Sequence, residues 1–338
     1  IASTLDGLLL GTELYMRTDR EKEATEVLLA VINARPEGNL EAIYSKLVTV
    51  YKARGMYDEA REVALELTIR NPLEWRPRIR LIDVLSSSGR IERRDREIEA
   101  LLQRHRNDEQ AMIALAQLAA TYGNVTAASR LYELALENGY DLSLFSLTLA
   151  ESLVAAGEYQ RAVDLCNELV EEDPGWLINS AVTFNGIRSL AYYGIGDREL
   201  GNLYLRNFLD AEGATMNVLF EVAKKFREFG LPEKAMVILE EAYRRDNRNE
   251  VILSQLIDVE MELGAFFAVD QHLKQLFALR RPDYDLLEDI HHRLRSDRFL
   301  FTRERRELLE NLEAVIAEQQ EMSWDIWKRI EEADKQES

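Results

Sequence analysis

The chain has 338 residues, of which 46% are hydrophobic and 30% are charged, with 42 Lys and Arg against 61 Asp and Glu. This much apolar material excludes a disordered chain. The net charge of −19 disfavours nonspecific binding to nucleic acid, because phosphate contacts depend on Lys and Arg. The longest apolar runs, such as Val27 to Ile32, are far shorter than the roughly 20 residues of a membrane-spanning helix. We therefore expect a soluble chain that does not bind nucleic acid.

Glycines recur at a fixed interval through most of the chain. They stand at Gly55, Gly89, Gly123, Gly157, Gly196, Gly230 and Gly264. Every step is 34 residues except the one from Gly157 to Gly196, which is 39. Each glycine is predicted to end a helix with a left-handed or otherwise open backbone. The five extra residues predict a longer helix around Trp176 to Tyr193 or a longer loop before it.

Apolar and small residues recur at fixed distances from these glycines. A small residue stands five positions later in most copies, at Ala60, Ala128, Ala162, Gly201 and Ala235. Large apolar residues stand four and eight positions earlier, at the spacing of one helical stripe. The departures from these columns are Arg94, Val269, Arg188 and Glu260. A helix pair with apolar faces on both sides cannot bury them alone, so the pairs are expected to stack.

This pattern resembles the tetratricopeptide repeat family, whose unit is a 34-residue helix–turn–helix. The clearest copies are Tyr44 to Ala60 and Leu149 to Ala162, and the resemblance covers about residues 5–282. It implies an all-α, right-handed solenoid of about eight antiparallel helix pairs. The first copy is weak, with Ala24 as its small residue and Asp19 in place of the glycine.

The C-terminal part of the chain lacks the glycine column. Residues Leu286 to Leu294 and Arg303 to Ala317 are predicted to be helices, the second with Thr302 as its N-cap. They are expected to cover the apolar face of the last repeat. The chain is thus divided into a repeat solenoid, 1–282, and a region of capping helices and an amphipathic tail, 283–338.

The tail carries aromatic residues at helical spacing. Trp324, Trp327 and Ile330 follow one another at steps of three, roughly on one helical face. Two interpretations stay open. The tail packs back on the solenoid, or it docks into another molecule or a second copy of the chain, because exposed tryptophan is a common interface anchor.

Motifs for catalysis, metals and cofactors are absent from the sequence. No phosphate-binding glycine loop is present, and Cys166, the single cysteine, reads as a small core residue. His291 and His292 are adjacent, so a helix directs them about 100° apart, which makes a poor ligand pair. We expect no enzymatic activity and no cofactor. An enzyme built on helical repeats would need a deep pocket with converging carboxylates or histidines.

In this family the first helix of each pair usually lines a concave face, and the resemblance implies that a partner binds there. The predicted partner-binding groove contains Ile113, Leu147, Val154, Leu190, Tyr193, Phe220, Lys224 and Arg227. Its middle is apolar and its flanks are charged, with Lys52 and Asp83 on one side, which suits an extended peptide or an amphipathic helix. The alternative is that long helices or the C-terminal tail fill this groove.

These observations predict a non-enzymatic scaffold or adaptor that binds a protein or peptide. A second hypothesis is the soluble repeat portion of a larger bacterial envelope machine, such as one for outer-membrane assembly or polysaccharide export. It is motivated by the tail tryptophans and by the first residue, Ile1, which indicates a processed protein or an excised piece. The compartment stays open between bacterial cytoplasm and periplasm, and self-association through the tail is a further hypothesis.

Overall fold

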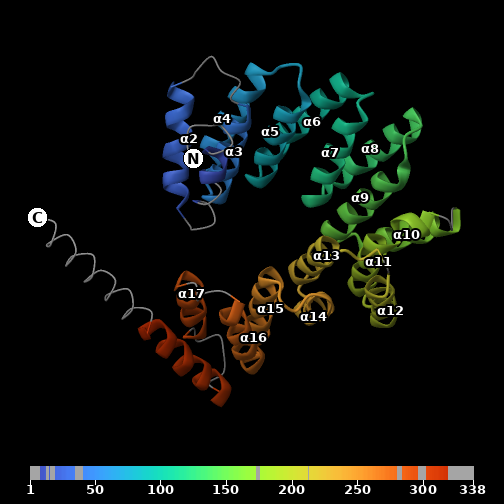
Figure 1. Cartoon of the computed structure of the whole chain (residues 1–338). Helices are drawn as coiled ribbons and strands as arrows, with labels where there is room; N and C mark the ends of the chain where they lie inside the picture. Colours follow the sequence, from blue (N-terminus) through green and yellow to red (C-terminus); the bar gives the residue numbers. More distant parts are fainter. Residues whose placement is uncertain are drawn as a thin grey trace, which may run out of the picture. The chain divides into compact units, whose positions relative to one another are not determined.

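The computed structural model describes residues 8–12, 15, 20–34, 41–172, 176–211, 213–279, 284–295 and 302–318. Within these ranges the regular secondary structure is helical, and no residue lies in a β-strand (Figure 1). The chain divides into two compact units. Unit 1 comprises residues 1–180 and 191–200, and unit 2 comprises residues 181–190 and 201–338.

Consecutive helix pairs build both units. Unit 1 contains α2 (Glu21–Ala34), then α3 (Glu41–Ala53) with α4 (Tyr57–Arg70), α5 (Trp75–Ser87) with α6 (Ile91–His105), α7 (Glu109–Thr121) with α8 (Val125–Asn138), and α9 (Leu142–Ala155) with α10 (Tyr159–Glu172). The boundary between the units crosses the next pair, α11 (Trp176–Gly194) with α12 (Arg198–Leu209). Unit 2 continues with α13 (Met216–Glu228) and α14 (Pro232–Arg245), α15 (Glu250–Leu263) and α16 (Phe266–Leu279), α17 (Tyr284–Leu294), and a helix over residues 303–318.

A left-handed glycine separates the two helices of every pair from α3 to α16. The φ angles of these seven residues run from 60° at Gly123 to 86° at Gly196, as the sequence predicts. At each turn the next residue closes the helix end with a backbone hydrogen bond, such as the one from Met56 N to Tyr51 O at 2.8 Å. Side chains are strained at such φ values, so glycine is required here.

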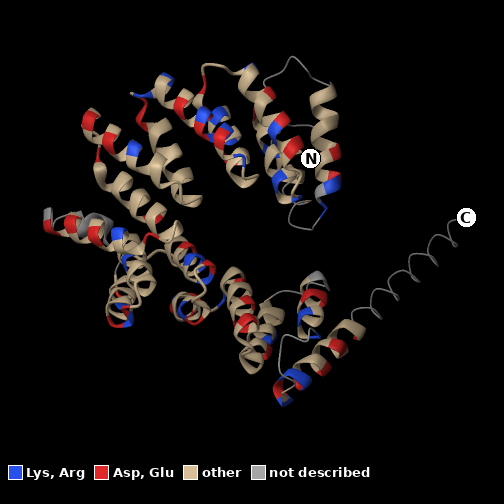
Figure 2. Cartoon of the chain, turned by 180° about the vertical axis from the view of Figure 1, so that it is seen from behind, with Lys and Arg blue, Asp and Glu red and all other residues tan. Residues whose placement is uncertain are grey.

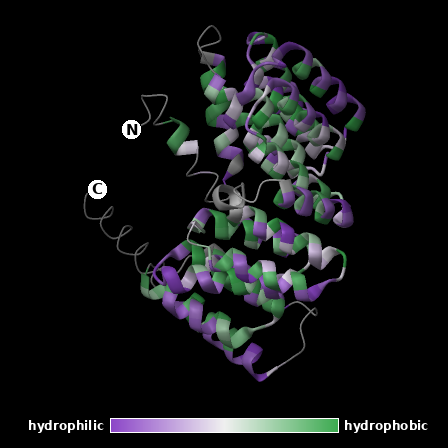
Figure 3. Ribbon diagram, turned by 90° about the vertical axis from the view of Figure 1, so that its right-hand side faces the viewer, coloured by the Kyte–Doolittle hydropathy of each residue, from purple (hydrophilic) through white to green (hydrophobic). Residues whose placement is uncertain are grey.

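The repeated small and apolar columns form the core. Ala60, Ala162 and Ala235 are fully buried, and this lets the two helices of each pair approach closely. Leu47 and Leu256, eight positions before their glycines, are at most 1% exposed. Each fully buried leucine contributes about 1.5–3 kcal/mol. Figure 3 shows hydrophobic and hydrophilic positions alternating along the helices, as stacked amphipathic pairs require.

The five extra residues between Gly157 and Gly196 lie in α11. This helix has 19 residues, whereas the other first helices have 13 or 14. The longer helix, the first of the two predicted alternatives, is therefore correct. α11 also approaches α13 closely, because a Cβ added at Gly186 would lie 2.9 Å from a methyl group of Val222.

Two of the polar departures from the apolar columns are compensated inside their own helix pair. Glu260 is 3% exposed, and its Oε1 lies 2.8 Å from Nδ1 of His272. In the α11–α12 pair, the guanidinium of Arg188 lies 4.1 Å from the ring centroid of Tyr204. His272 and Tyr204 both stand eight positions after their glycines, so each polar residue on a first helix has its partner at the same place on the second.

The last helices cover the end of the repeat stack in unit 2. Leu287, Ile290 and Leu308 are buried in one cluster with side chains of α15 and α16. Thr302 Oγ1 accepts a hydrogen bond from the backbone N–H of Arg305 at 3.2 Å, which confirms the predicted N-cap. The domain boundary at residue 282 stays a prediction. Among the described helices, none combines the length and the apolar character needed to cross a bilayer.

Candidate functional site: the first-helix face of unit 1

The first helices of unit 1 form one continuous surface, which we call the first-helix face. Consecutive first helices contact one another directly, α3 with α5, α5 with α7, and α7 with α9. The second helices make their main contacts with first helices, such as α4 with α5 and α8 with α9. Neighbouring pairs are therefore in direct contact along the first-helix side of unit 1.

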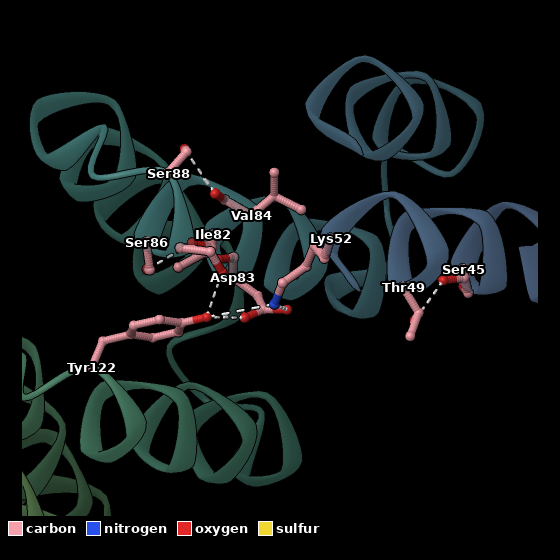
Figure 4. Close-up of polar contacts among 10 residues, drawn as sticks. Ser45, Thr49, Lys52, Ile82, Asp83, Val84, Ser86, Ser88 and Tyr122 are labelled. Atoms are coloured by element: carbon pink, nitrogen blue, oxygen red, sulfur yellow. Dashed lines mark hydrogen bonds and ion pairs between the residues drawn. The ribbon is translucent and has the colours of Figure 1, made fainter. Parts of the chain in front are cut away.

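A polar network joins three consecutive first helices on this face (Figure 4). Lys52 Nζ on α3 donates to Asp83 Oδ2 on α5 at 2.6 Å. The hydroxyl of Tyr122, which follows α7, donates to Asp83 Oδ1 at 2.6 Å and lies 2.6 Å from Ser87 Oγ. Asp83 therefore accepts from both neighbouring repeats and fixes the spacing of the three helices at this end of the face.

The network keeps its charges paired in a partly buried site. Burial alone lowers the pKa of Lys52, but the hydrogen bond and the charge of Asp83 outweigh it, so this pKa lies above its ordinary value of 10.5. Burial, together with the hydrogen bond to Asp83, raises the pKa of Tyr122 above its ordinary value of 10.0. At neutral pH Lys52 is therefore an ammonium and Tyr122 a neutral phenol.

Three consecutive serines follow Asp83 at the end of α5. Ser86, Ser87 and Ser88 each bond through the hydroxyl to the backbone carbonyl one turn earlier, at 2.8–2.9 Å. These bonds satisfy the hydroxyls locally, and Ser87 in addition reaches Tyr122. From the sequence, Lys52 and Asp83 were predicted to lie on a charged flank of the groove. The contribution of Tyr122 was not predicted, because the position just before the glycine was not among the predicted groove columns.

The other end of the first-helix face is apolar. Ile113 on α7 and Leu147 on α9 occupy equivalent positions in adjacent repeats, and both are half-buried. Val154 is 9% exposed. Tyr193 is half-buried, and its burial raises the pKa of its phenol although the charge of Arg198 lowers it. Ile113 and Leu147 thus present part of their side chains to solvent.

A model of the tetratricopeptide repeat family matches residues 146–175, which cover most of α9 and all of α10. The same helix pair, with its left-handed glycine and buried small residue, recurs on both sides of this match. The chain contains a tetratricopeptide repeat at residues 146–175.

Solved structures include distant likenesses to this chain. One is a tetratricopeptide repeat protein from Parabacteroides merdae, with 18% identity, coverage of 76% of this chain and 98% of that chain, and a TM-score of 0.42. Another is the APC/C hetero-tetramer Cut9–Hcn1, with 13% identity, coverage of 92% and 57%, and a TM-score of 0.33. A search of curated proteins gave no match.

The groove residues predicted for this repeat protein divide between the two units. Ile113, Leu147, Val154 and Tyr193 belong to unit 1, and Leu190, Phe220, Lys224 and Arg227 belong to unit 2. Leu190 was expected to face a partner but is only 2% exposed. It lies in a stretch from Ser189 to Tyr192 that is buried throughout, so this part of α11 is enclosed on all sides.

Charges on the first helices of unit 2 are paired along the stack. Arg227 Nε lies 2.7 Å from Glu262, and Asp258 lies 2.9 Å from Arg293. Lys224 is different, because its side chain is 67% exposed and lies 3.9 Å from Glu228. Phe220 is half-buried. Figure 2 shows Lys and Arg interspersed with Asp and Glu along the helices, which favours such local pairing.

Two further predictions concern metal ions and the tail. Within the described ranges, no three His, Cys, Asp or Glu side chains converge as a metal ion would require. Trp324 and Trp327 lie outside the described residues.

Proposed function

We propose that the chain is a non-enzymatic scaffold that binds a protein or peptide partner on the first-helix face of unit 1. Tetratricopeptide repeats generally mediate protein–protein interaction, and they do so through the extended surfaces that stacking creates. The observation that carries the proposal is the pair of half-buried apolar side chains, Ile113 and Leu147, at equivalent positions of adjacent helices.

The spacing of these two residues suits a regular peptide. Packed helices lie about 8–10 Å apart, so equivalent side chains on neighbouring first helices have roughly that separation. Residues seven apart on an α-helix are about 10 Å apart on one side, and residues three apart on an extended polyproline II segment are about 9 Å apart on one side. A helix or an extended segment of a partner can therefore place one apolar side chain against Ile113 and the next against Leu147.

The polar network supports binding at the same face. Lys52 is already paired with Asp83, so a partner does not have to neutralise a lone charge when it covers this end. Gln117 is exposed on α7 between the polar and apolar ends, and its amide offers both a donor and an acceptor to a peptide backbone.

Substitution of the apolar pair tests the proposal. Partners are first isolated with the unaltered chain from its native extract, identified by mass spectrometry, purified, and titrated by calorimetry. In Ile113→Glu/Leu147→Glu, affinity should fall at least about tenfold, because hot-spot contacts contribute 1–2 kcal/mol or more. The matched control is Leu136→Glu, since Leu136 is 60% exposed on second helix α8.

Circular dichroism should give the same helical signal for both variants and the unaltered chain. Unchanged affinity in the double variant, or an equal loss in Leu136→Glu, would reject the first-helix face as the binding surface. Turnover of a substrate by the purified chain would contradict the non-enzymatic part of the proposal.

A further inference from the structure

A hollow in unit 2 lies between α16 and the helix over residues 303–318. Its volume is about 380 Å³, and its lining includes Phe267 and Lys274 from α16 and Glu304, Glu307 and Leu308 from the C-terminal helix. The space is open to solvent on one side and large enough for aromatic side chains.

The apolar part of the hollow leaves an aromatic ring in water. Phe267 is 68% exposed, whereas Leu308 beside it is 2% exposed and belongs to the core of the C-terminal helices. Aromatic side chains contribute to stability by burying 150–250 Å² each. Covering the Phe267 ring would therefore gain free energy.

The rim of the hollow carries excess negative charge. Lys274 is paired with Asp270 at 2.5 Å, which leaves the exposed carboxylates Glu304 and Glu307 on the opposite rim. Glu307 has an ion pair with Arg303 at 2.6 Å, and Arg303 is itself 85% exposed. A segment with aromatic side chains followed by cations would match this surface.

The chain itself contains such a segment directly after the C-terminal helix. Trp324 and Trp327 are followed by Lys328 and Arg329, and then by Ile330. We propose that this tail segment, residues 324–330, docks into the hollow of its own molecule, with a tryptophan against Phe267 and the cations near Glu304 and Glu307.

The chain is long enough for this contact. Residue 318 lies ten residues beyond Leu308 on the helix, which corresponds to about 15 Å. Residues 319–323 can span up to about 16–18 Å when extended. This reach is just enough to bring Trp324 back to the level of Leu308, provided that the tail reverses direction directly after residue 318.

Fluorine NMR of the full chain tests the proposal. The four tryptophans are replaced by 5-fluorotryptophan, and the resonances of Trp324 and Trp327 are assigned with the corresponding Trp→Phe variants. The solvent isotope shift between H₂O and D₂O measures the exposure of each ring. At least one tail resonance should have a reduced shift, and Phe267→Glu should restore it to the value of an exposed ring.

Two further variants make the test specific. Glu304→Lys/Glu307→Lys should restore the shift partly, because the rim then repels Lys328 and Arg329. The matched control, Val251→Glu on α15, replaces another exposed apolar residue, 56% exposed, and should leave the tail resonances unchanged. Tail resonances that are fully exposed in the unaltered chain, or unaffected by Phe267→Glu, would overturn the proposal. So would shielding that disappears on dilution, because the occupant would then be the tail of a second copy.

Discussion

The buried pair of Glu260 and His272 makes a sharp prediction about stability. Removal of the imidazole in His272→Leu leaves a carboxylate that is 3% exposed without its nearest partner. A buried polar group that loses its hydrogen-bond partner typically destabilises a protein by about 1–3 kcal/mol, and by more when the group is charged. The side chain of His272 is 16% exposed, so some water reaches the site and we expect a loss of about 3 kcal/mol.

The double variant should recover most of this loss. Glu260→Leu/His272→Leu places apolar residues where most other repeats have them, and replacement of a whole buried pair by packed apolar residues is often neutral or stabilising. We expect its stability to lie within about 1 kcal/mol of the unaltered chain. The coupling in the double-mutant cycle should therefore exceed about 2 kcal/mol.

The measurement has to be local, because long repeat arrays do not unfold in one step. Urea unfolding followed by circular dichroism gives the overall change, and hydrogen exchange of the amides of α15 and α16 gives the change at the site. Lys274→Gln is the control, since it removes an exposed i,i+4 pair with Asp270 and should change stability by only about 0.3–0.5 kcal/mol. Equal losses in His272→Leu and in the double variant would refute the reasoning.

Three further predictions concern unit 1. Gly123→Ala should lower the midpoint of thermal unfolding more than Gly89→Ala. The φ angles are similar, 60° at Gly123 and 68° at Gly89, but only at Gly123 would the new Cβ lie 3.1 Å from a backbone atom, the nitrogen of Ala156. Because the pKa of Tyr122 is higher in the folded chain than in the unfolded chain, the neutral phenol stabilises the fold below about pH 10, and this contribution is lost as the phenol ionises. In urea titrations at alkaline pH, Tyr122→Phe should therefore lose less stability than the unaltered chain. Asp141→Ala should cost about 1 kcal/mol by calorimetry, because the carboxylate caps α9 through the N–H of Ser143 at 2.9 Å; an unchanged value would contradict the cap.

The periodic part of the fold could be predicted from the sequence because each position of a repeat has one physical role. The glycine column predicted the turns, and the 39-residue step predicted either a longer helix or a longer loop before it, of which the structure has the longer helix, α11. Both follow from backbone geometry, which depends on nearby residues only. Glu260 and Arg188 were visible as departures, but their partners were not, since a column describes one position at a time.

The candidate site was less predictable because exposure depends on neighbouring repeats. Leu190 occupies a position expected to face a partner, yet the residues around it in α11 are buried on every side. Tyr122 lies just outside the predicted columns, and its role depends on a carboxylate 39 residues away in the chain. A pattern that repeats once per helix pair cannot show such contacts across three pairs.

The two kinds of polar pairing have opposite consequences for rearranging the chain. Glu260 and His272 lie in one hairpin, so their buried contact stays intact when that hairpin is moved, whereas Glu262 and Asp258 of the same hairpin would lose Arg227 and Arg293. Lys52, Asp83 and Tyr122 come from three successive hairpins, and swapping any one of them would separate an ammonium from its carboxylate. Recombination is therefore expected to preserve the contact between Glu260 and His272 wherever their hairpin is placed, and to keep the order of the first three glycine-linked hairpins.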